Sequence, residues 1–278
     1  MLTRLLLLFA VIALPAPLAA QEATDPAADA WCPRGERDLP RGPDWLCYGR
    51  FNDDYSFAFV YPKAVEKVPE LDAQIRTEAG LAEAWIAARV AEARAEGREV
   101  PRLSYEGGWQ VDAVLPEIAA ASGAISHYTG GAHGGIEYRT ILFDRRAGSR
   151  IALADIFAPG FFGTRLLGER LYGERAVQRA FCRALTAQVR ERRDDPAADV
   201  RCPAIEAQPV TLVCGPSGRI EMLRALLNPY VVGSWAEGPY EVDVPIDAAM
   251  MSAIKRRLRP AFGLAREARP RIPARPCR

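Results

Sequence analysis

The first twenty residues constrain the fold most, because they have the pattern of an export signal. Such a signal is removed, so these residues would not be part of the folded protein. One positive residue, Arg4, precedes an uninterrupted apolar run from Leu5 to Leu14, and a small-residue segment follows at 18–20. This order is typical of a secretory signal peptide. The run is shorter than the ~20 apolar residues that span a bilayer. The sequence therefore predicts a signal peptide at 1–20, no transmembrane anchor, and a mature protein that is periplasmic or secreted.

All six cysteines lie after this segment. An even number of cysteines in an exported chain indicates disulfides, although sequence alone cannot choose among the possible pairings. Proximity along the chain, and elimination for the last pair, predict Cys32–Cys47, Cys182–Cys202 and Cys214–Cys277. There is no C-x-x-C pair and the chain has only two histidines, so no zinc site is indicated. No metal and no other cofactor is expected.

The charges of the mature chain are formally balanced but unevenly distributed. Residues 255–278 carry nine basic side chains and one acidic, a net of +8, whereas residues 21–254 carry 26 basic and 34 acidic, a net of −8. An acidic body could attract a cationic partner, and a basic tail could contact anionic envelope polymers. The alternative is that the tail folds back on the body. No nucleic-acid-binding motif accompanies the export signal, so nucleic acid is not an expected partner.

Hydrophobic periodicity predicts an α+β fold. Helical spacing favours amphipathic helices at about 69–96 and 163–193, and Asp247 is a candidate N-cap for a short helix through Leu258. Short connections between strands favour antiparallel hairpins. The order strand, helix, strands occurs twice, which predicts two subdomains, each an antiparallel sheet covered on one face by a long amphipathic helix. Alternating apolar residues predict the strands at 55–61, 109–113, 118–128, 137–143, 151–153, 209–215 and 238–245.

These elements suggest a division of the mature chain. An N-terminal disulfide-stapled loop is expected at 21–50, a first subdomain at 51–157, a second at 158–258 and a basic tail at 259–278.

The run from Ile125 to Gly135 is the candidate functional segment, because it holds both histidines and four glycines. Glycines permit a sharp turn and close approach to the main chain. The candidate binding residues are Tyr128, Thr129, Gly130, Gly131, His133 and Gly134.

Four interpretations of this segment compete. His133 could act as a general base, but no local nucleophile or carboxylate accompanies it. A metal site using His127 and His133 would lack a third ligand, and a phosphate site would lack the helix that should follow the glycines. The fourth interpretation is that His133 forms a hydrogen bond within the turn and has a structural role. No catalytic residue is assigned.

The residues also resemble a known family. Residues 128–134, 140–144 and 151–157 are similar to the hallmark of the PdaC/RsiV-like extracytoplasmic domains, and 228–245 resembles the signature that closes their C-terminal subdomain. The resemblance covers roughly 51–258. It implies a PdaC-like subdomain at 51–157 and an RsiV-like subdomain at 158–258. It also implies binding in the cell envelope without a known reaction.

The sequence thus predicts a periplasmic or envelope binding protein, and it favours a non-enzymatic role over an enzymatic one. Its expected partner is an envelope polymer such as peptidoglycan, or a wall-acting protein such as lysozyme. The alternative is an envelope hydrolase that uses His133, and a third possibility is an accessory protein without a small ligand.

Overall fold

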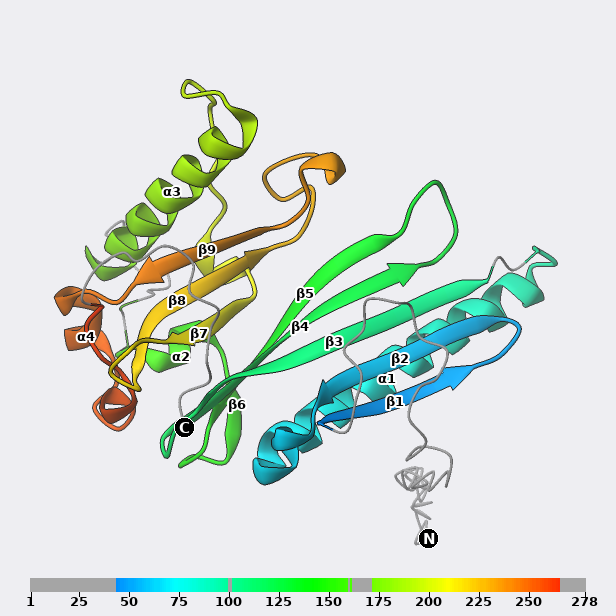
Figure 1. Cartoon of the computed structure of the whole chain (residues 1–278), viewed down its shortest axis with the longest axis horizontal. Helices are drawn as coiled ribbons and strands as arrows, with labels where there is room; N and C mark the ends of the chain where they lie inside the picture. Colours follow the sequence, from blue (N-terminus) through cyan, green and yellow to red (C-terminus); the bar gives the residue numbers. More distant parts are fainter. Residues whose placement is uncertain (1–43, 100–101, 160, 162–171, 266–278) are drawn as a thin grey trace, which may run out of the picture.

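The computed structural model describes residues 44–99, 102–159, 161 and 172–265. These residues form two β-sheets, one of six strands and one of three, with helices packed against both (Figure 1). The α+β fold that the hydrophobic periodicity predicts is therefore confirmed.

The six-stranded sheet follows the order of the chain, β1-β2-β3-β4-β5-β6. Its strands are β1 (Trp45–Phe51), β2 (Tyr55–Pro62), β3 (Leu103–Val114), β4 (Ile118–Tyr128), β5 (Gly135–Asp144) and β6 (Ser149–Ile151). Neighbouring strands are antiparallel except β2 and β3, which are parallel. Parallel neighbours need a long crossover connection, and helix α1 (Pro69–Ala95) lies in it. The expected antiparallel pairing holds everywhere in this sheet except at that crossover.

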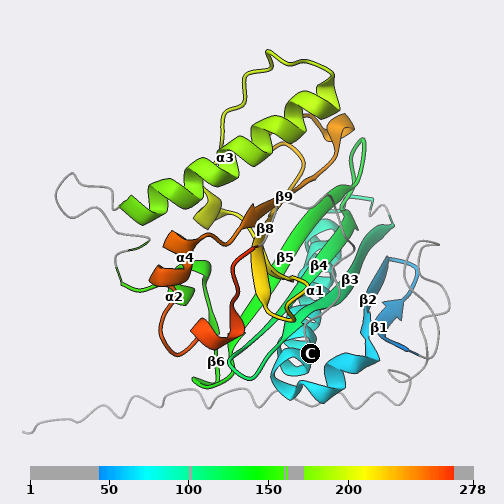
Figure 2. The ribbon, with the colours of Figure 1, turned by 60° about the vertical axis from the view of Figure 1, so that its left-hand side comes forward.

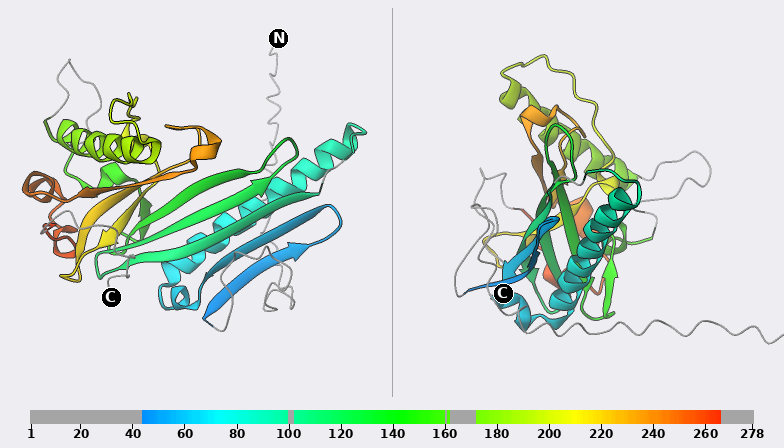
Figure 3. Two further views of the ribbon diagram at one scale, coloured as in Figure 1. Left: turned by 45° about the horizontal axis from the view of Figure 1, so that its top comes forward. Right: turned by 90° about the vertical axis from the view of Figure 1, so that its right-hand side faces the viewer.

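Helix α1 covers one face of the six-stranded sheet, as Figure 3 shows. Proline occupies its first turn, where a missing N–H is tolerated, and the helix ends just before Gly97. Side chains three or four positions apart pack on aromatic residues of β2 and β3. These buried helix residues are Leu71, Ile75, Ala79, Ala82, Ile86 and Val90.

The second subdomain contains helix α3 (Tyr172–Arg193) and the antiparallel sheet β7-β8-β9. Its strands are β7 (Val210–Cys214), β8 (Ile220–Leu227) and β9 (Tyr240–Pro245). The buried side of α3, which includes Phe181 and Leu185, packs on this sheet. A disulfide between Cys182 and Cys202, the pairing expected from proximity, ties the helix to the segment before β7.

The six-stranded sheet is covered on both faces at the β6 end (Figure 2). On β4, Ala119 and Ala121 belong to the core beneath α1, whereas Ile118 and Ala120 belong to the core shared with the second subdomain. Farther along β4 the second face opens, because Ala124 and Ser126 are exposed. The hairpin of β4 and β5 therefore extends beyond the shared core.

Two strands were not expected. Strand β1 occupies the end of the segment predicted as a loop, and it pairs as an edge strand with β2. Its residues are mostly half-buried, so their apolar pattern is weak. Strand β8 lies between two others and is buried on most positions, which removes the alternation that marks a half-exposed strand.

One further prediction is corrected at the C-terminal side. Helix α4 (Ala248–Ala253) is capped by Asp247 as expected, through a 2.8 Å hydrogen bond from the amide of Met250, but it ends before Leu258. The segment from Arg259 to Ala265, where the predicted basic tail begins, packs on the second subdomain, and the rest of the predicted tail lies outside the described residues. Phe262 is buried there and bridges to Ile220.

Cys47 and Cys214 are disulfide-bonded too, and none of the described cysteines is free. Their expected partners, Cys32 and Cys277, lie outside the described residues, so both pairings stay predictions. The predicted signal peptide and the predicted start of the second long helix at 163 also lie outside them. Among the described helices, none is both long and apolar enough to cross a membrane.

Candidate functional site

The candidate segment forms the turn between β4 and β5. Gly130 and Gly131 have φ angles of 92° and 108°, which side-chain-bearing residues rarely adopt. The hydroxyl of Tyr128 donates a 3.1 Å hydrogen bond to the carbonyl of Gly131. Thr129 is exposed at the tip. The glycines therefore serve the shape of the turn, as the sequence suggested.

His133 extends from this turn toward the loop between β8 and β9. Its Nδ1 lies 2.8 Å from the carbonyl oxygen of Gly134, and its Nε2 lies 3.2 Å from the hydroxyl of Tyr230. A carbonyl only accepts, so Nδ1 donates to Gly134, and the Tyr230 hydroxyl, which can donate or accept, bonds Nε2. The imidazole also stacks on Trp235, with ring centroids 4.7 Å apart and planes 19° apart. We call His133, Tyr230 and Trp235 the aromatic cluster.

Tyr230 is an exposed member of the cluster. Its side chain is 64% exposed, and its φ angle of 70° is uncommon for a residue other than glycine. The backbone holds this conformation through a 3.1 Å hydrogen bond from the Tyr230 amide to the Gly233 carbonyl. A strained backbone that presents a large aromatic side chain to solvent is typical of a functional site.

The loop that carries Trp235 is held by Glu237. The carboxylate accepts hydrogen bonds from the amide of Ser234 (3.1 Å), the hydroxyl of Tyr240 (2.8 Å) and the guanidinium of Arg193 (2.9 Å). The hydrogen bond from Arg193 is the main reason why the pKa of Glu237 falls to about 2. Glu237 therefore stays ionised at any physiological pH and keeps the one-turn helix η3 (Trp235–Glu237) in place.

A second set of contacts joins the same loop to β5. The side chain of Asn228 accepts a 2.7 Å hydrogen bond from the amide of Tyr138, and the Tyr138 hydroxyl lies 3.4 Å from Glu241. Burial raises the pKa of Tyr138 to about 12, so the hydroxyl remains a donor. The hairpin and the β8–β9 loop are thus connected both at the aromatic cluster and nearer the core.

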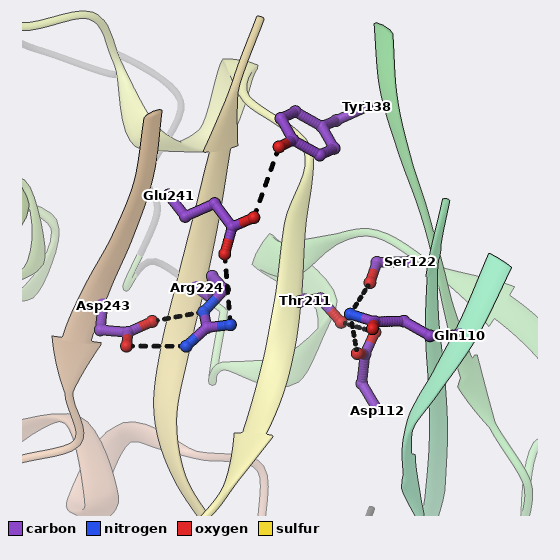
Figure 4. Close-up of polar contacts among 8 residues, drawn as sticks. All are labelled: Gln110, Asp112, Ser122, Tyr138, Thr211, Arg224, Glu241 and Asp243. Atoms are coloured by element: carbon purple, nitrogen blue, oxygen red, sulfur yellow. Dashed lines mark hydrogen bonds and ion pairs between the residues drawn. The ribbon is translucent and has the colours of Figure 1, made fainter. Parts of the chain in front are cut away.

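Asp112 is the other unusual titratable group, and it lies between the two sheets (Figure 4). The register of β3 against β4 shifts at this position, a bulge that turns the side chain toward β7. Its carboxylate is bonded to the hydroxyl of Thr211 at 2.6 Å and to the amide of Gln110 at 3.1 Å. Burial raises the pKa of Asp112 to about 6, although these hydrogen bonds oppose the shift.

The surroundings of Asp112 indicate a structural role. The side chain of Gln110 also bonds Ser122, and Arg224 nearby forms a bidentate pair with Asp243 at 2.6 and 2.9 Å. In Figure 4 the Gln110, Ser122 and Thr211 side chains surround Asp112 between the sheets, whereas the Arg224–Asp243 pair lies at β8 and β9. A titratable group that is buried and fully hydrogen-bonded holds the sheets together and offers no room for a substrate.

The two histidines do not come together. His127 lies on the face of β4 that packs toward α1, whereas His133 stacks on Trp235. The described part of the chain contains no group of three or more His, Cys, Asp or Glu side chains that could hold a metal ion. The ring nitrogens of His133 bond a carbonyl and a phenol, and neither partner is a carboxylate or an aliphatic nucleophile.

Tyr230 and Trp235 were not among the predicted site residues. Both lie between 228 and 238, a segment rich in turn-forming residues that predicts a loop. Two large aromatic side chains in such a loop were the available signal, because aromatic residues outside strands and helices have no obvious core to fill.

Comparison with known proteins gives a likeness of fold. No family model matches the chain, and no curated protein matches it either. A DUF3298 family protein from Pseudomonas aeruginosa PAO1 is 17% identical, over 79% of this chain and 96% of that one, with a TM-score of 0.48. A member of the same family from Bacteroides fragilis is 14% identical, over 73% and 85%, with a TM-score of 0.46. At such values the likeness carries no functional assignment.

Proposed function

We propose that this protein is an exported, non-catalytic binding protein of the cell envelope, and that its aromatic cluster binds the sugar rings of peptidoglycan. The single observation that carries the proposal is the stack of exposed His133 and Tyr230 with half-buried Trp235, on two loops that other contacts hold in place. The resemblance to PdaC/RsiV-like domains and the disulfides support an envelope location.

The chemistry of a sugar ring suits such a cluster. One face of a pyranose presents C–H groups, which pack well on the electron-rich face of an aromatic ring. The three rings are within 30° of parallel, with centroids 4.7 to 6.4 Å apart, and the exposed ring of Tyr230 offers the surface for such packing. Polar groups at the edge, such as the Tyr230 hydroxyl, can bond sugar hydroxyls. Because the loops are already connected, binding costs little conformational entropy.

Binding is favoured over hydrolysis by the partners of His133. A general base needs a free acceptor within reach of the proton that it removes. Both ring nitrogens of His133 already have partners, because Nε2 is bonded to the Tyr230 hydroxyl and Nδ1 donates to a backbone carbonyl. A hydrolase acting through His133 would instead have an orienting carboxylate on one nitrogen and a nucleophile near the other.

The proposal is tested by co-sedimentation of the mature protein with insoluble peptidoglycan sacculi. We expect the wild-type protein to sediment with the sacculi and the Tyr230→Ala variant to remain largely in solution. Val231→Ala is the matched control, because Val231 is an exposed apolar neighbour in the same loop but no part of the cluster. Equal sedimentation of all three proteins would contradict the proposal.

A parallel assay separates the polymer from a protein partner. The acidic body of the mature chain could attract a basic enzyme such as lysozyme through charge alone. Capture of lysozyme, without retention on sacculi, would replace the proposed ligand by a protein. Release of soluble fragments from sacculi, lost in His133→Ala with an unchanged melting temperature, would favour the hydrolase.

A further inference from the structure

A second site lies on the opposite face of the same hairpin. A pocket of about 380 Å³ opens between α1 and the strands β3, β4 and β5. It is lined by Leu81, Ala82, Trp85, Tyr105, His127, Glu137 and Arg139. None of these residues belongs to the aromatic cluster, and the site goes beyond the proposed function without depending on it.

Two buried polar atoms in this pocket have no hydrogen-bond partner among the described residues. They are the hydroxyl oxygen of Tyr105 and the Nδ1 of His127. Tyr105 is only 3% exposed, and buried polar groups in native proteins almost always have a partner. Burial also raises the pKa of Tyr105, so its hydroxyl is a donor. An unpartnered donor and a ring nitrogen in the same pocket indicate a ligand with polar groups of its own.

The apolar part of the pocket is formed by an exposed tryptophan. Trp85 is 39% exposed although it is the largest side-chain type, and Leu81, one helical turn before it, is 62% exposed. The guanidinium of Arg89 lies 5.6 Å from the indole centre, and Tyr105 lies 5.8 Å from it at a plane angle of 58°. Exposed apolar side chains beside unpartnered polar atoms are typical of a binding pocket.

The charges at the rim favour a neutral ligand. Arg139 bonds Glu137 at 3.0 Å and Glu78 at 2.9 Å, so its charge is balanced by carboxylates on either side. Tyr105 lies between Phe59 and His127, with ring centroids 6.1 Å away on each side. A cation would therefore find neither a free tyrosine face nor an excess of negative charge.

We propose that this pocket binds one neutral pyranose ring, with its C–H face on Trp85 and its hydroxyl or amide groups bonded to Tyr105 and His127. The carboxylate of Glu137 and the guanidinium of Arg139 are planar polar groups suited to adjacent sugar hydroxyls. Both polar atoms are buried, so binding requires neighbouring side chains to move, and Trp85, which is 39% exposed and contacts the Tyr105 ring, is the neighbour assigned to this movement. The expected Kd for a single ring is on the order of 1 mM.

The experiment is a titration with N-acetylglucosamine followed by NMR. It uses the Tyr230→Ala variant of the mature protein, so that the aromatic cluster does not contribute. The chain has only two histidines, so the ring signals of His127 are identified by comparison with His127→Gln. We expect saturable shifts of the His127 signals. We also expect Trp85→Ala to weaken binding about 10-fold or more.

Tyr105→Phe separates the two roles, because only the binding role predicts weaker binding of the sugar. Loss of a buried, unpartnered hydroxyl should raise the melting temperature by about 2–4 °C. It should also lower the affinity for the sugar about 5-fold. Tyr48→Phe is the matched control, since the Tyr48 hydroxyl bonds Glu83 at 2.9 Å. That control should not raise the melting temperature and should leave sugar binding unchanged.

Three results would overturn the proposal. The first is the absence of saturable His127 shifts at concentrations well above 1 mM. The second is saturation by p-cresol instead of the sugar, which would indicate an aromatic ligand. The third is a lower melting temperature for Tyr105→Phe together with unchanged binding. Retention of the protein on sacculi remains a separate measurement, so failure here and failure of the proposed function are distinguishable.

Discussion

The imidazole of His133 stacks on the indole of Trp235, with 4.7 Å between ring centroids. This contact joins the turn of the β4–β5 hairpin to the loop between β8 and β9, which belong to different sheets. It also places Tyr230 beside both rings. The role of the glycine-rich turn is therefore to place His133 against the β8–β9 loop of the second subdomain.

The first prediction concerns His133. His133→Ala should lower affinity for sacculi about 3- to 10-fold, because the aromatic cluster loses one of its three rings. The free energy of unfolding should fall by less than about 1 kcal/mol, since the ring is exposed. Urea unfolding and co-sedimentation measure the two effects. A loss of several kcal/mol would show that His133 has a structural role in the turn.

The second prediction concerns the pH dependence that Asp112 introduces. Its pKa is about 6 in the folded protein and near 3.8 for an unperturbed aspartate. Between these pH values the folded protein holds a proton that the unfolded chain releases, so stability falls as pH rises. At pH 7 the buried charge should cost roughly 2–4 kcal/mol relative to acid conditions.

The Asp112→Asn variant tests whether Asp112 makes stability fall as pH rises. The amide keeps an oxygen for Gln110 and offers a donor to Thr211, but it does not titrate. Urea unfolding at several pH values between about 4 and 7.5 should show the variant gaining stability over the wild type as pH rises. The other carboxylates affect both proteins alike, so the difference isolates Asp112. A constant difference across this range would refute the assignment.

The third prediction concerns the buried carboxylate of Asp144. It accepts two hydrogen bonds from the guanidinium of Arg257, at 2.6 and 2.9 Å, and so ties β5 to the segment after α4. Arg257→Ala should therefore destabilise the fold by about 1–3 kcal/mol. The exposed neighbour Arg256 provides the control, because Arg256→Ala should change stability by less than about 0.5 kcal/mol. Equal effects in thermal unfolding would contradict this role.

The fourth prediction concerns two glycines. A methyl group at Gly135 would collide with the His127 ring on the opposite strand, whereas a methyl group at Gly80 would meet nothing within 4 Å. Gly135→Ala should therefore destabilise the protein by about 1–3 kcal/mol. Gly80→Ala should stabilise it by about 0.5–1 kcal/mol, because Gly80 lies within α1. Thermal unfolding of the two variants measures both changes, and effects of the same sign would count against the described packing.

Much of the fold could be predicted because the apolar residues recur regularly along several of its strands and helices. The alternation from Tyr55 to Tyr61 marks β2, and the helical spacing after Pro69 marks α1, as the structure confirms. Strand β8 escaped prediction because burial on both sides removes alternation. The parallel pairing of β2 with β3 depends on where a 27-residue helix returns the chain, and local sequence does not encode that.

The candidate site also contains residues that the sequence could predict and residues that it could not. The glycines and His133 stand out locally, because their composition is unusual. Their partners Tyr230 and Trp235 lie about a hundred positions away, and only the packing of the two sheets brings them together. The unpartnered hydroxyl of Tyr105 is likewise invisible in sequence, since Tyr105 fits the alternation of an ordinary buried strand residue.

The most direct test of the central claim is a calorimetric titration of the mature protein with soluble peptidoglycan fragments. We predict saturable binding with a sub-millimolar Kd, weakened about 3- to 10-fold in both Tyr230→Ala and Trp235→Ala and unchanged in Val231→Ala. No heat of binding to the wild-type protein at sub-millimolar concentration, or equal affinity in all four proteins, would contradict the assignment of the aromatic cluster as a saccharide site.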